Sequence, residues 1–145
     1  MKTKDRESKV KILLLITGSI AAVKIPLLVS QMVKENYQIK CVLSKNAENL
    51  IHPLSLSILS RNSCILEDDQ WSNNQSSPIH IDLCNWADIL IVAPLTATTL
   101  SKWVTGNAEG LIPSILIANV KPTIVAPAMN TKMWLNQAVQ KNYEL

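Results

Sequence analysis

The most constraining feature of the sequence is the apolar run at residues 10–17, "VKILLLIT", in which aliphatic side chains follow one another almost without interruption. A strand that is apolar on both faces needs a packing layer on each side, and such strands are typical of the centre of a parallel sheet. Two later runs, "ADILIVAP" at residues 87–94 and "TIVAP" at residues 123–127, have the same character. The chain is therefore expected to build a parallel sheet covered on both faces.

Helix-like segments alternate with these strands. After residues 10–17, apolar side chains recur on one helical face, at Ile25, Leu28, Val29, Met32 and Val33. Pro26 lies early in this segment and predicts a kink or a restart of the helix. Residues 38–44 and 63–67 are predicted strands, separated by a helical stretch that is broken at Pro53.

The second half repeats this alternation after a polar loop at residues 68–78. Helices are predicted at residues 96–106, at residues 110–120 with an interruption near Pro113, and from residue 131 onward with Leu135, Ala138 and Val139 facing inward. The order of segments predicts an α/β fold of three layers, a flavodoxin-like or Rossmann-like parallel sheet with helices on both faces. That architecture serves many chemistries and does not define a function.

Composition limits the class of protein. A length of 145 residues suits one domain, residues 1–145, and a net charge of +3 is too small to indicate nucleic-acid binding. Residues 1–11 resemble a solvated basic leader and not a signal peptide, and no apolar run is long enough to cross a bilayer. Three widely spaced cysteines without a CxxC pair favour buried thiols over a zinc site. We expect a soluble, cytoplasmic domain without a metal.

Small and hydroxylated residues follow two of the predicted strands. Gly18 and Ser19 come after the first, and Pro94 ends the fourth before Thr96, Thr98 and Thr99. Backbone N–H groups at such helix starts favour a phosphate, although a tight turn and a threonine cap explain the same residues. The first turn lacks the GxGxxG pattern of dinucleotide-binding proteins, which argues against NAD.

Two further residues are candidates for a site. His80 lies between the polar loop and a buried strand, near the carboxyl edge of the sheet or a subunit interface, where it can move protons or simply be a surface residue beside Asp82. Asn130 follows residues 123–127, so it or Thr131 can cap a helix and can also face a ligand at the strand end. His52 is interpreted as structural.

Taken together, three blocks resemble the homo-oligomeric flavin-containing cysteine decarboxylases. They are "GSIAAVK" at residues 18–24, "HIDLCNWADILIVAPLTATTLSKW" at residues 80–103 and "PAMNTKMW" at residues 127–134. The last block is the most specific, and together they extend over nearly the whole chain. The similarity is strongest to the branch that converts phosphopantothenoylcysteine to phosphopantetheine in coenzyme A biosynthesis.

This resemblance implies an FMN site between the subunits of a homotrimer or homododecamer. The residues implied to hold FMN are Gly18, Ser19, Ile20, Ser44, Lys45, Asn46, Thr96, Ala97, Thr98, Thr99 and Ala128. His80 is implied to be the catalytic histidine, and Asn130, with Met129 beside it, is implied to bind the substrate carboxylate. The implied reaction is a redox-neutral decarboxylation in which FMN takes up and returns two electrons.

Three departures from the family pattern leave alternatives open. Thr98 stands where the family usually has an asparagine, and the family's GxANDL-like segment reads "GNAEGL" at residues 106–111. The family also continues into a further strand and a cysteine-bearing flap, which are not expected in residues 1–145. A non-catalytic flavin-binding or regulatory paralogue and a flavin prenyltransferase-like protein are the alternatives, and "PAMNTKMW" argues against the second.

Overall fold

The computed structural model describes residues 9–145, which form a parallel sheet with helices on both faces. Most of the predicted basic leader, residues 1–8, lies outside the described residues. The strand order is β3-β2-β1-β4-β5, which is the Rossmann-like order and selects between the two predicted windings. The strands are β1 (Lys11–Ile16), β2 (Gln38–Leu43), β3 (Ile65–Leu66), β4 (Ile89–Leu95) and β5 (Thr123–Pro127).

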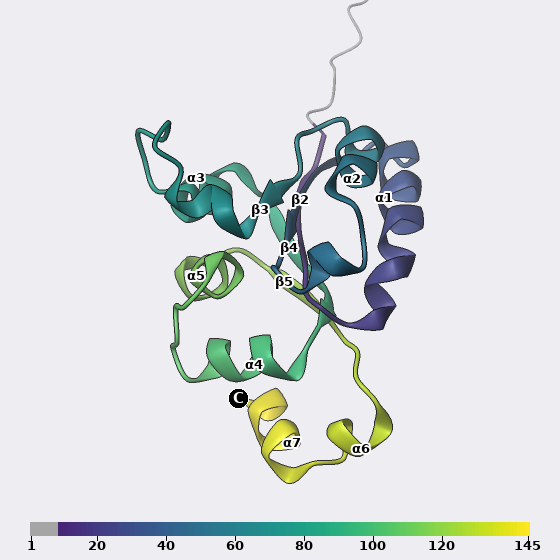
Figure 1. Ribbon diagram of the computed structural model, residues 1–145, viewed down its shortest axis with the longest axis vertical. Coiled ribbons are helices and arrows are strands. Elements are labelled where there is room, and N and C mark those ends of the chain that lie inside the picture. Colours follow the sequence, from purple (N-terminus) through teal and green to yellow (C-terminus); the bar gives the residue numbers. More distant parts are fainter. Residues whose placement is uncertain (1–8) are drawn as a thin grey trace, which may run out of the picture.

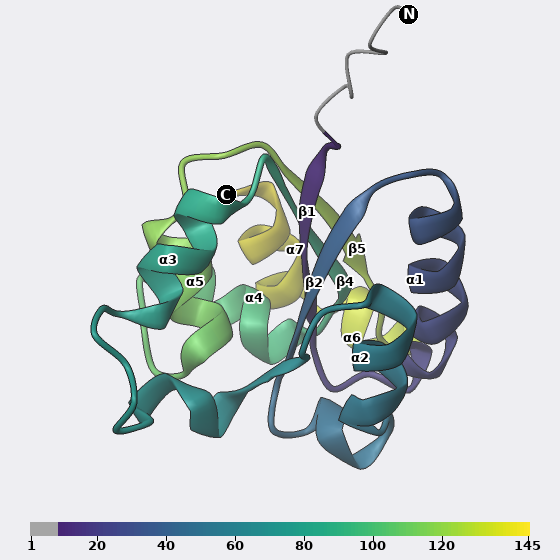
Figure 2. The same cartoon turned by 90° about the horizontal axis from the view of Figure 1, so that it is seen from above.

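Helices cover the sheet in two layers (Figures 1 and 2). The first layer contains α1 (Ile25–Lys34) and α2 (Pro53–Ser60), and the second contains α3 (Ile79–Trp86), α4 (Ala97–Val104) and α5 (Leu111–Ala118). Beyond the carboxyl ends of the strands lie α6 (Thr131–Trp134) and α7 (Gln137–Glu144). Short 3₁₀ turns, η1 (Ile20–Lys24), η2 (Ala47–Asn49) and η3 (Glu67–Trp71), complete the connections. None of the helices in residues 9–145 is long and apolar enough to cross a membrane.

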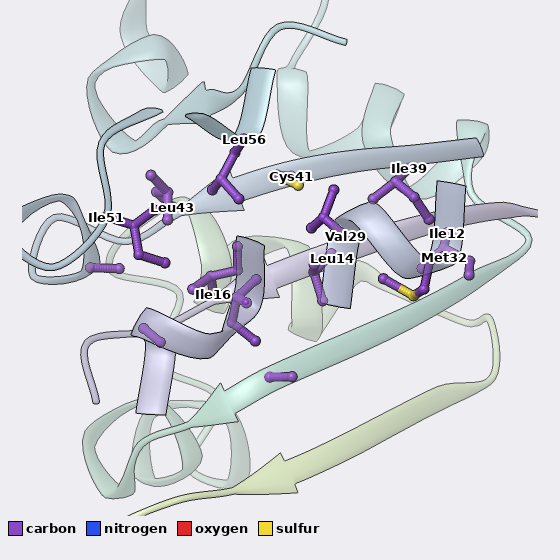
Figure 3. Close-up of a cluster of buried hydrophobic side chains, with 14 residues drawn as sticks. Ile12, Leu14, Ile16, Val29, Met32, Ile39, Cys41, Leu43, Ile51 and Leu56 are labelled. Atoms are coloured by element: carbon purple, nitrogen blue, oxygen red, sulfur yellow. The ribbon is translucent and has the colours of Figure 1, made fainter. Parts of the chain in front are cut away.

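The central strand β1 contributes to two separate cores, as its apolar run predicts. Ile12, Leu14 and Ile16 face α1 and α2, and Figure 3 shows this cluster with Val29 from α1. Leu13 and Leu15 point to the opposite face, where side chains of α3, α4 and α5 cover them. Because successive side chains of a strand alternate between faces, only a strand covered on both sides can keep all five buried.

Prolines mark three places where the structure refines or corrects the sequence-based expectation. Pro26 lies at the start of α1, directly after η1, so the predicted restart is confirmed. Pro94 does not end β4, which runs on to Leu95 through an irregularity in its pairing with β5. Pro113 does not interrupt α5, because it occupies the first helical turn, where the missing N–H is not needed.

Two helical segments differ from the expectation. Residues 79–86, for which no helix was predicted, form α3 and carry His80. The last segment is divided into two helices, because Asn136 caps a new one through a hydrogen bond from the N–H of Ala138 at 2.9 Å. Its predicted inward face is wrong, since Leu135 is 68% exposed and Ala138 is also exposed, whereas Val139 is half-buried.

Candidate functional site

A cavity of about 880 Å³ opens at the carboxyl ends of β1 and β4, the point where the strand order reverses. Ligands of doubly wound sheets bind at such a switch point. The segments after β1, β2, β4 and β5 and the start of α5 all contribute to its walls. Among its lining residues are Gly18, Ser19, Ile20, Ser44, Lys45, Asn46, Thr96, Ala97, Thr98, Thr99, Ala128, Met129 and Asn130. The structure therefore brings together every candidate residue except His80.

The helix start after β4 supplies hydrogen-bond donors to the cavity. Thr96 caps α4, and its Oγ1 accepts a hydrogen bond from the N–H of Thr99 at 3.3 Å. Ala97 and Thr98 occupy the first turn, where an N–H group has no acceptor within the helix. These two donors point out of the start of an eight-residue helix, whose dipole favours an anion. The threonine cap is confirmed, and it leaves the N–H groups of Ala97 and Thr98 available for the predicted contact with a phosphate.

The turn after β1 approaches the turn after β2 very closely. A Cβ placed on Gly18 would lie 2.4 Å from the Cβ of Asn46, which no relaxed structure tolerates. Gly18 is therefore required for this close approach and not for an unusual backbone angle. Ser19 caps η1, because its Oγ accepts a hydrogen bond from the N–H of Ala21 at 3.3 Å. In the turn after β2, the Oγ of Ser44 accepts a hydrogen bond from the N–H of Ala47 at 3.2 Å.

Charged side chains are distributed around the cavity. Lys45 Nζ donates to Asp68 Oδ2 at 3.0 Å, and this hydrogen bond together with the attraction of the carboxylate raises the pKa of Lys45. Lys102 Nζ donates to the carbonyl oxygen of Glu109 at 3.2 Å. Both lysines line the cavity together with Glu67 and Glu109, so its rim carries charges of both signs. Among residues 9–145, no group of three or more His, Cys, Asp and Glu side chains is arranged to hold a metal ion.

Asn130 combines two features that the sequence left open. Its Oδ1 accepts a hydrogen bond from the N–H of Met133 at 2.9 Å and so caps α6, which confirms the cap. The same residue lines the cavity. Just before it, the N–H of Ala128 donates to the carbonyl oxygen of Leu95 at 3.1 Å, so the "PAMN" segment is held beside the end of β4.

The two histidines lie elsewhere. His80 is half-buried in the first turn of α3 and does not line the cavity of its own chain. Its neighbour Asp82 accepts a hydrogen bond from Ser77 Oγ at 2.5 Å. His52 caps α2, with Nδ1 accepting from the N–H of Leu54 at 3.1 Å, which agrees with the structural role expected for it.

Several lining residues were not predicted. These are Thr17, Ala21, Glu67, Lys102, Glu109, Gly110, Ile112, Pro113 and Met133. The rule that ligands gather at strand ends points to Thr17 and Glu67, which follow β1 and β3 directly. The start of α5 carries no such signal, because it follows another helix. It joins the cavity through tertiary packing, because α5 packs against α3, α4 and η3.

The strand order and the cavity at its switch point define a doubly wound α/β protein of the Rossmann-like class. A family model described as Flavoprotein matches residues 1–145, and the chain belongs to this family. The chain is 38% identical to a probable phosphopantothenoylcysteine decarboxylase of Streptococcus mutans, over 93% of this chain and 76% of the relative. The predicted family resemblance is confirmed.

Solved structures agree with this assignment. A PPC decarboxylase mutant complexed with pantothenoylaminoethenethiol has a TM-score of 0.80 and 33% identity, over 94% of this chain and 76% of that one. The FMN-dependent cysteine decarboxylase SpaF has a TM-score of 0.85 and 28% identity, over 93% and 77%. The chain spans only 32% of the bifunctional coenzyme A biosynthesis protein CoaBC of Bacillus subtilis, to which it is 35% identical over 90% of its own length.

Proposed function

We propose that residues 1–145 form one FMN-binding domain that decarboxylates phosphopantothenoylcysteine to phosphopantetheine in coenzyme A biosynthesis. The observation that carries this proposal is the convergence on one cavity of the strand-end residues after β1, β2 and β4 with Asn130 after β5. The names of the relatives support the same reaction and the same cofactor. A cytoplasmic location is part of the proposal, supported by the free, buried thiols of Cys41 and Cys84.

The residues present fit FMN. The free N–H groups of Ala97 and Thr98 and the hydroxyl of Thr99 suit the phosphate and ribityl chain. On the apolar side, Ile20 and Ala128 suit the flat ring system. When bound, FMN supplies the reversible uptake of two electrons that this decarboxylation requires. The cavity is also large enough to admit part of a substrate, because its volume lies near the upper end for small-molecule sites.

Asn130 is the proposed substrate-binding residue. Its Oδ1 is engaged by the N–H of Met133, which leaves the Nδ2 amide hydrogens directed away from the helix as donors. A carboxylate of the substrate accepts such hydrogen bonds. The cap fixes the orientation of the amide, so that the Nδ2 hydrogens are available to a ligand. Met129, which also lines the cavity, contributes an apolar contact.

His80 is the proposed acid/base, and an oligomer is needed to bring it to a cavity. Because His80 lies outside the cavity of its own chain, we propose a homotrimer or homododecamer in which it serves the cavity of a second copy. An apolar stripe on η1 and α1 supports assembly, with Ile20 74%, Val23 50% and Leu27 78% exposed. These side chains follow one helical face and adjoin the cavity at Ile20.

The test is turnover by the purified chain loaded with FMN. The assay follows loss of carbon dioxide from phosphopantothenoylcysteine by mass spectrometry of the product. A peptide that ends in cysteine serves as a second substrate, because it presents the same carboxylate and thiol on a different carrier. Conversion of phosphopantothenoylcysteine in preference to the peptide is expected. Bound FMN without any product would favour the non-catalytic paralogue, and failure to bind FMN would refute the proposal as a whole.

A further inference from the structure

Helix α5 begins without a side chain that could cap it. Its N-cap residue is Gly110, and the first two N–H groups, those of Leu111 and Ile112, have no acceptor within the helix. Pro113 at the third position has no N–H at all. The acceptor comes instead from a distant part of the chain. Both carboxylate oxygens of Glu67 accept from the N–H of Leu111, at 2.9 and 3.0 Å, across 44 residues.

Glu67 and Gly110 fit each other sterically. A Cβ on Gly110 would lie 3.3 Å from Glu67 Oε1 and 3.5 Å from Pro113 Cδ. Gly110 also has a φ of +106°, which residues with a side chain rarely adopt. Absence of a side chain at Gly110 therefore gives the carboxylate room to reach Leu111. The negative charge of Glu67 at the start of α5 also complements the helix dipole.

This contact lies in the wall of the cavity. Glu67, Gly110, Ile112 and Pro113 all line it. On the side of α4, the same wall is held by the hydrogen bond from Lys102 Nζ to the carbonyl oxygen of Glu109. Glu67 directly follows β3, so its carboxylate ties the start of α5 to the carboxyl edge of the sheet.

We propose that Glu67 is a positioning residue, which caps α5 in place of Gly110 and holds the α5 wall of the cavity at its distance from the sheet. The cap itself is independent of the cofactor, and only its consequence for FMN affinity rests on the proposed function. The inference requires that substitutions at positions 67 and 110 have non-additive effects on stability. A side chain that accepts hydrogen bonds at one of the two positions caps α5 and makes an acceptor at the other unnecessary.

The test uses the full chain without FMN and four variants: Glu67→Ala, Glu67→Gln, Gly110→Asp and the double variant Glu67→Ala/Gly110→Asp. Amide hydrogen exchange at Leu111 and the thermal midpoint are measured. We expect faster exchange in Glu67→Ala and a midpoint lower by about 3 °C. Glu67→Gln keeps an oxygen acceptor and should retain most of the protection. Asp68→Ala removes the adjacent carboxylate and is the matched control, with Leu111 unaffected.

The double variant decides the question. Gly110→Asp alone should be destabilising, because its Cβ approaches Glu67 and its φ is unfavourable. With Glu67 removed, the close approach to its carboxylate is gone and an aspartate at the N-cap position can accept from the helix start, whereas the strain of the positive φ remains. The double variant should therefore lose less stability than the sum of the two single losses. Additive losses, or unchanged exchange at Leu111 in Glu67→Ala, would overturn the cap.

FMN affinity tests the consequence for the cavity. The Kd should rise in Glu67→Ala by up to roughly fivefold, the limit that is reached if FMN binding must offset the whole stability lost with one helix cap. It should return part of the way toward the wild-type value in the double variant. An unchanged Kd in Glu67→Ala with faster exchange at Leu111 would refute the positioning role. If the wild-type chain bound no FMN, the proposed function would fail, whereas the exchange measurements would still decide the cap.

Discussion

The Oγ1 of Thr17 accepts a hydrogen bond from the N–H of Thr96 at 3.0 Å, across 79 residues of sequence. The same hydroxyl donates to the carbonyl oxygen of Pro94 at 2.6 Å, and Thr17 is almost completely buried. One side chain thus satisfies both a donor and an acceptor where the pairing of β4 is irregular. It fixes the distance between the two strand ends from which the cavity is built.

Replacement of Thr17 by valine should lower the free energy of unfolding by about 1–3 kcal/mol, because it leaves the Thr96 N–H without its acceptor and removes the hydroxyl from the Pro94 carbonyl. The Pro94 carbonyl keeps its second hydrogen bond, from the backbone N–H of residue 17 at 3.3 Å. Thr17→Ser keeps the hydroxyl and should cost less. Urea unfolding of both variants measures the difference. Equal stability of the valine and serine variants would contradict a role for the hydrogen bonds.

Gly18→Ala should weaken FMN binding, because the new methyl group would lie 2.4 Å from the Cβ of Asn46 and must push the two turns apart. Asn46→Gly removes the opposing Cβ, so the combination Gly18→Ala/Asn46→Gly should recover part of the affinity lost in Gly18→Ala. Flavin fluorescence quenching gives the Kd of each variant. The steric explanation is wrong if the double variant binds more weakly than both single variants.

Two substitutions of Asn130 should separate its cap from its proposed contact with substrate. Asn130→Asp keeps an oxygen for the N–H of Met133, and we expect normal stability and FMN binding but no decarboxylation, because the donor Nδ2 is replaced by a second oxygen. Asn130→Ala also loses the cap and should be less stable by about 1 kcal/mol. Urea unfolding and product analysis distinguish the two effects. Full activity of Asn130→Asp would contradict the proposal that Asn130 binds the substrate carboxylate.

His80→Asn should leave FMN bound and abolish decarboxylation. If His80 acts on the cavity of a second copy, co-expression of His80→Asn with Asn130→Asp should restore activity, because some cavities then combine an intact Asn130 with an intact His80. In a randomly mixed cyclic trimer, about a quarter of the cavities have this combination. His52→Asn, which keeps a cap acceptor for α2, is the histidine control. Inactive mixed oligomers, verified by two affinity tags, would contradict action between copies.

Alkaline pH should destabilise the fold through the buried thiol of Cys41 and the half-buried thiol of Cys64. Burial raises the pKa of Cys64 from 9.0 to about 12, and burial raises the pKa of Cys41 further. Above pH 9 the unfolded chain therefore releases these protons first, so the free energy of unfolding falls as the pH rises from 9 toward 12. Urea unfolding at pH 8 and pH 10 should show a smaller loss for Cys64→Ala than for the wild type. Identical losses would show that this thiol does not contribute.

The sheet and part of the cavity follow from local patterns in the sequence, and the family resemblance supplied further lining residues such as Ser44 and Ala128. Continuous apolar runs identified the central strands, and small or hydroxylated residues after them identified the lining at Gly18 and Thr96. What could not be predicted depends on tertiary packing. The wall at Gly110 belongs to the start of a helix, and its acceptor Glu67 lies 44 residues away, so no local pattern links the two.

The prediction of a single helix after residue 131 was wrong for a related reason. The periodicity of apolar residues over residues 131–145 indicated one amphipathic helix. Instead, Asn136 caps a new helix, α7, and the predicted inward-facing residues no longer share one buried face. A side chain that competes with the helix for backbone hydrogen bonds can divide an otherwise continuous pattern. Sequence periodicity alone does not show whether such a segment forms one continuous helix or two helices divided at the capping residue.

The pairing of β1 with β4 joins the earliest strand to one that comes much later, and Thr17 and Pro94 are 77 residues apart. Such a contact requires closure of a long loop before any part of the switch point exists. On the ribosome, the pairing of β1 with β4 must wait until β4 is synthesised, and the cavity must wait further for Asn130. A chain in the course of synthesis therefore cannot acquire its cofactor early, and flavin uptake should report completion of the fold.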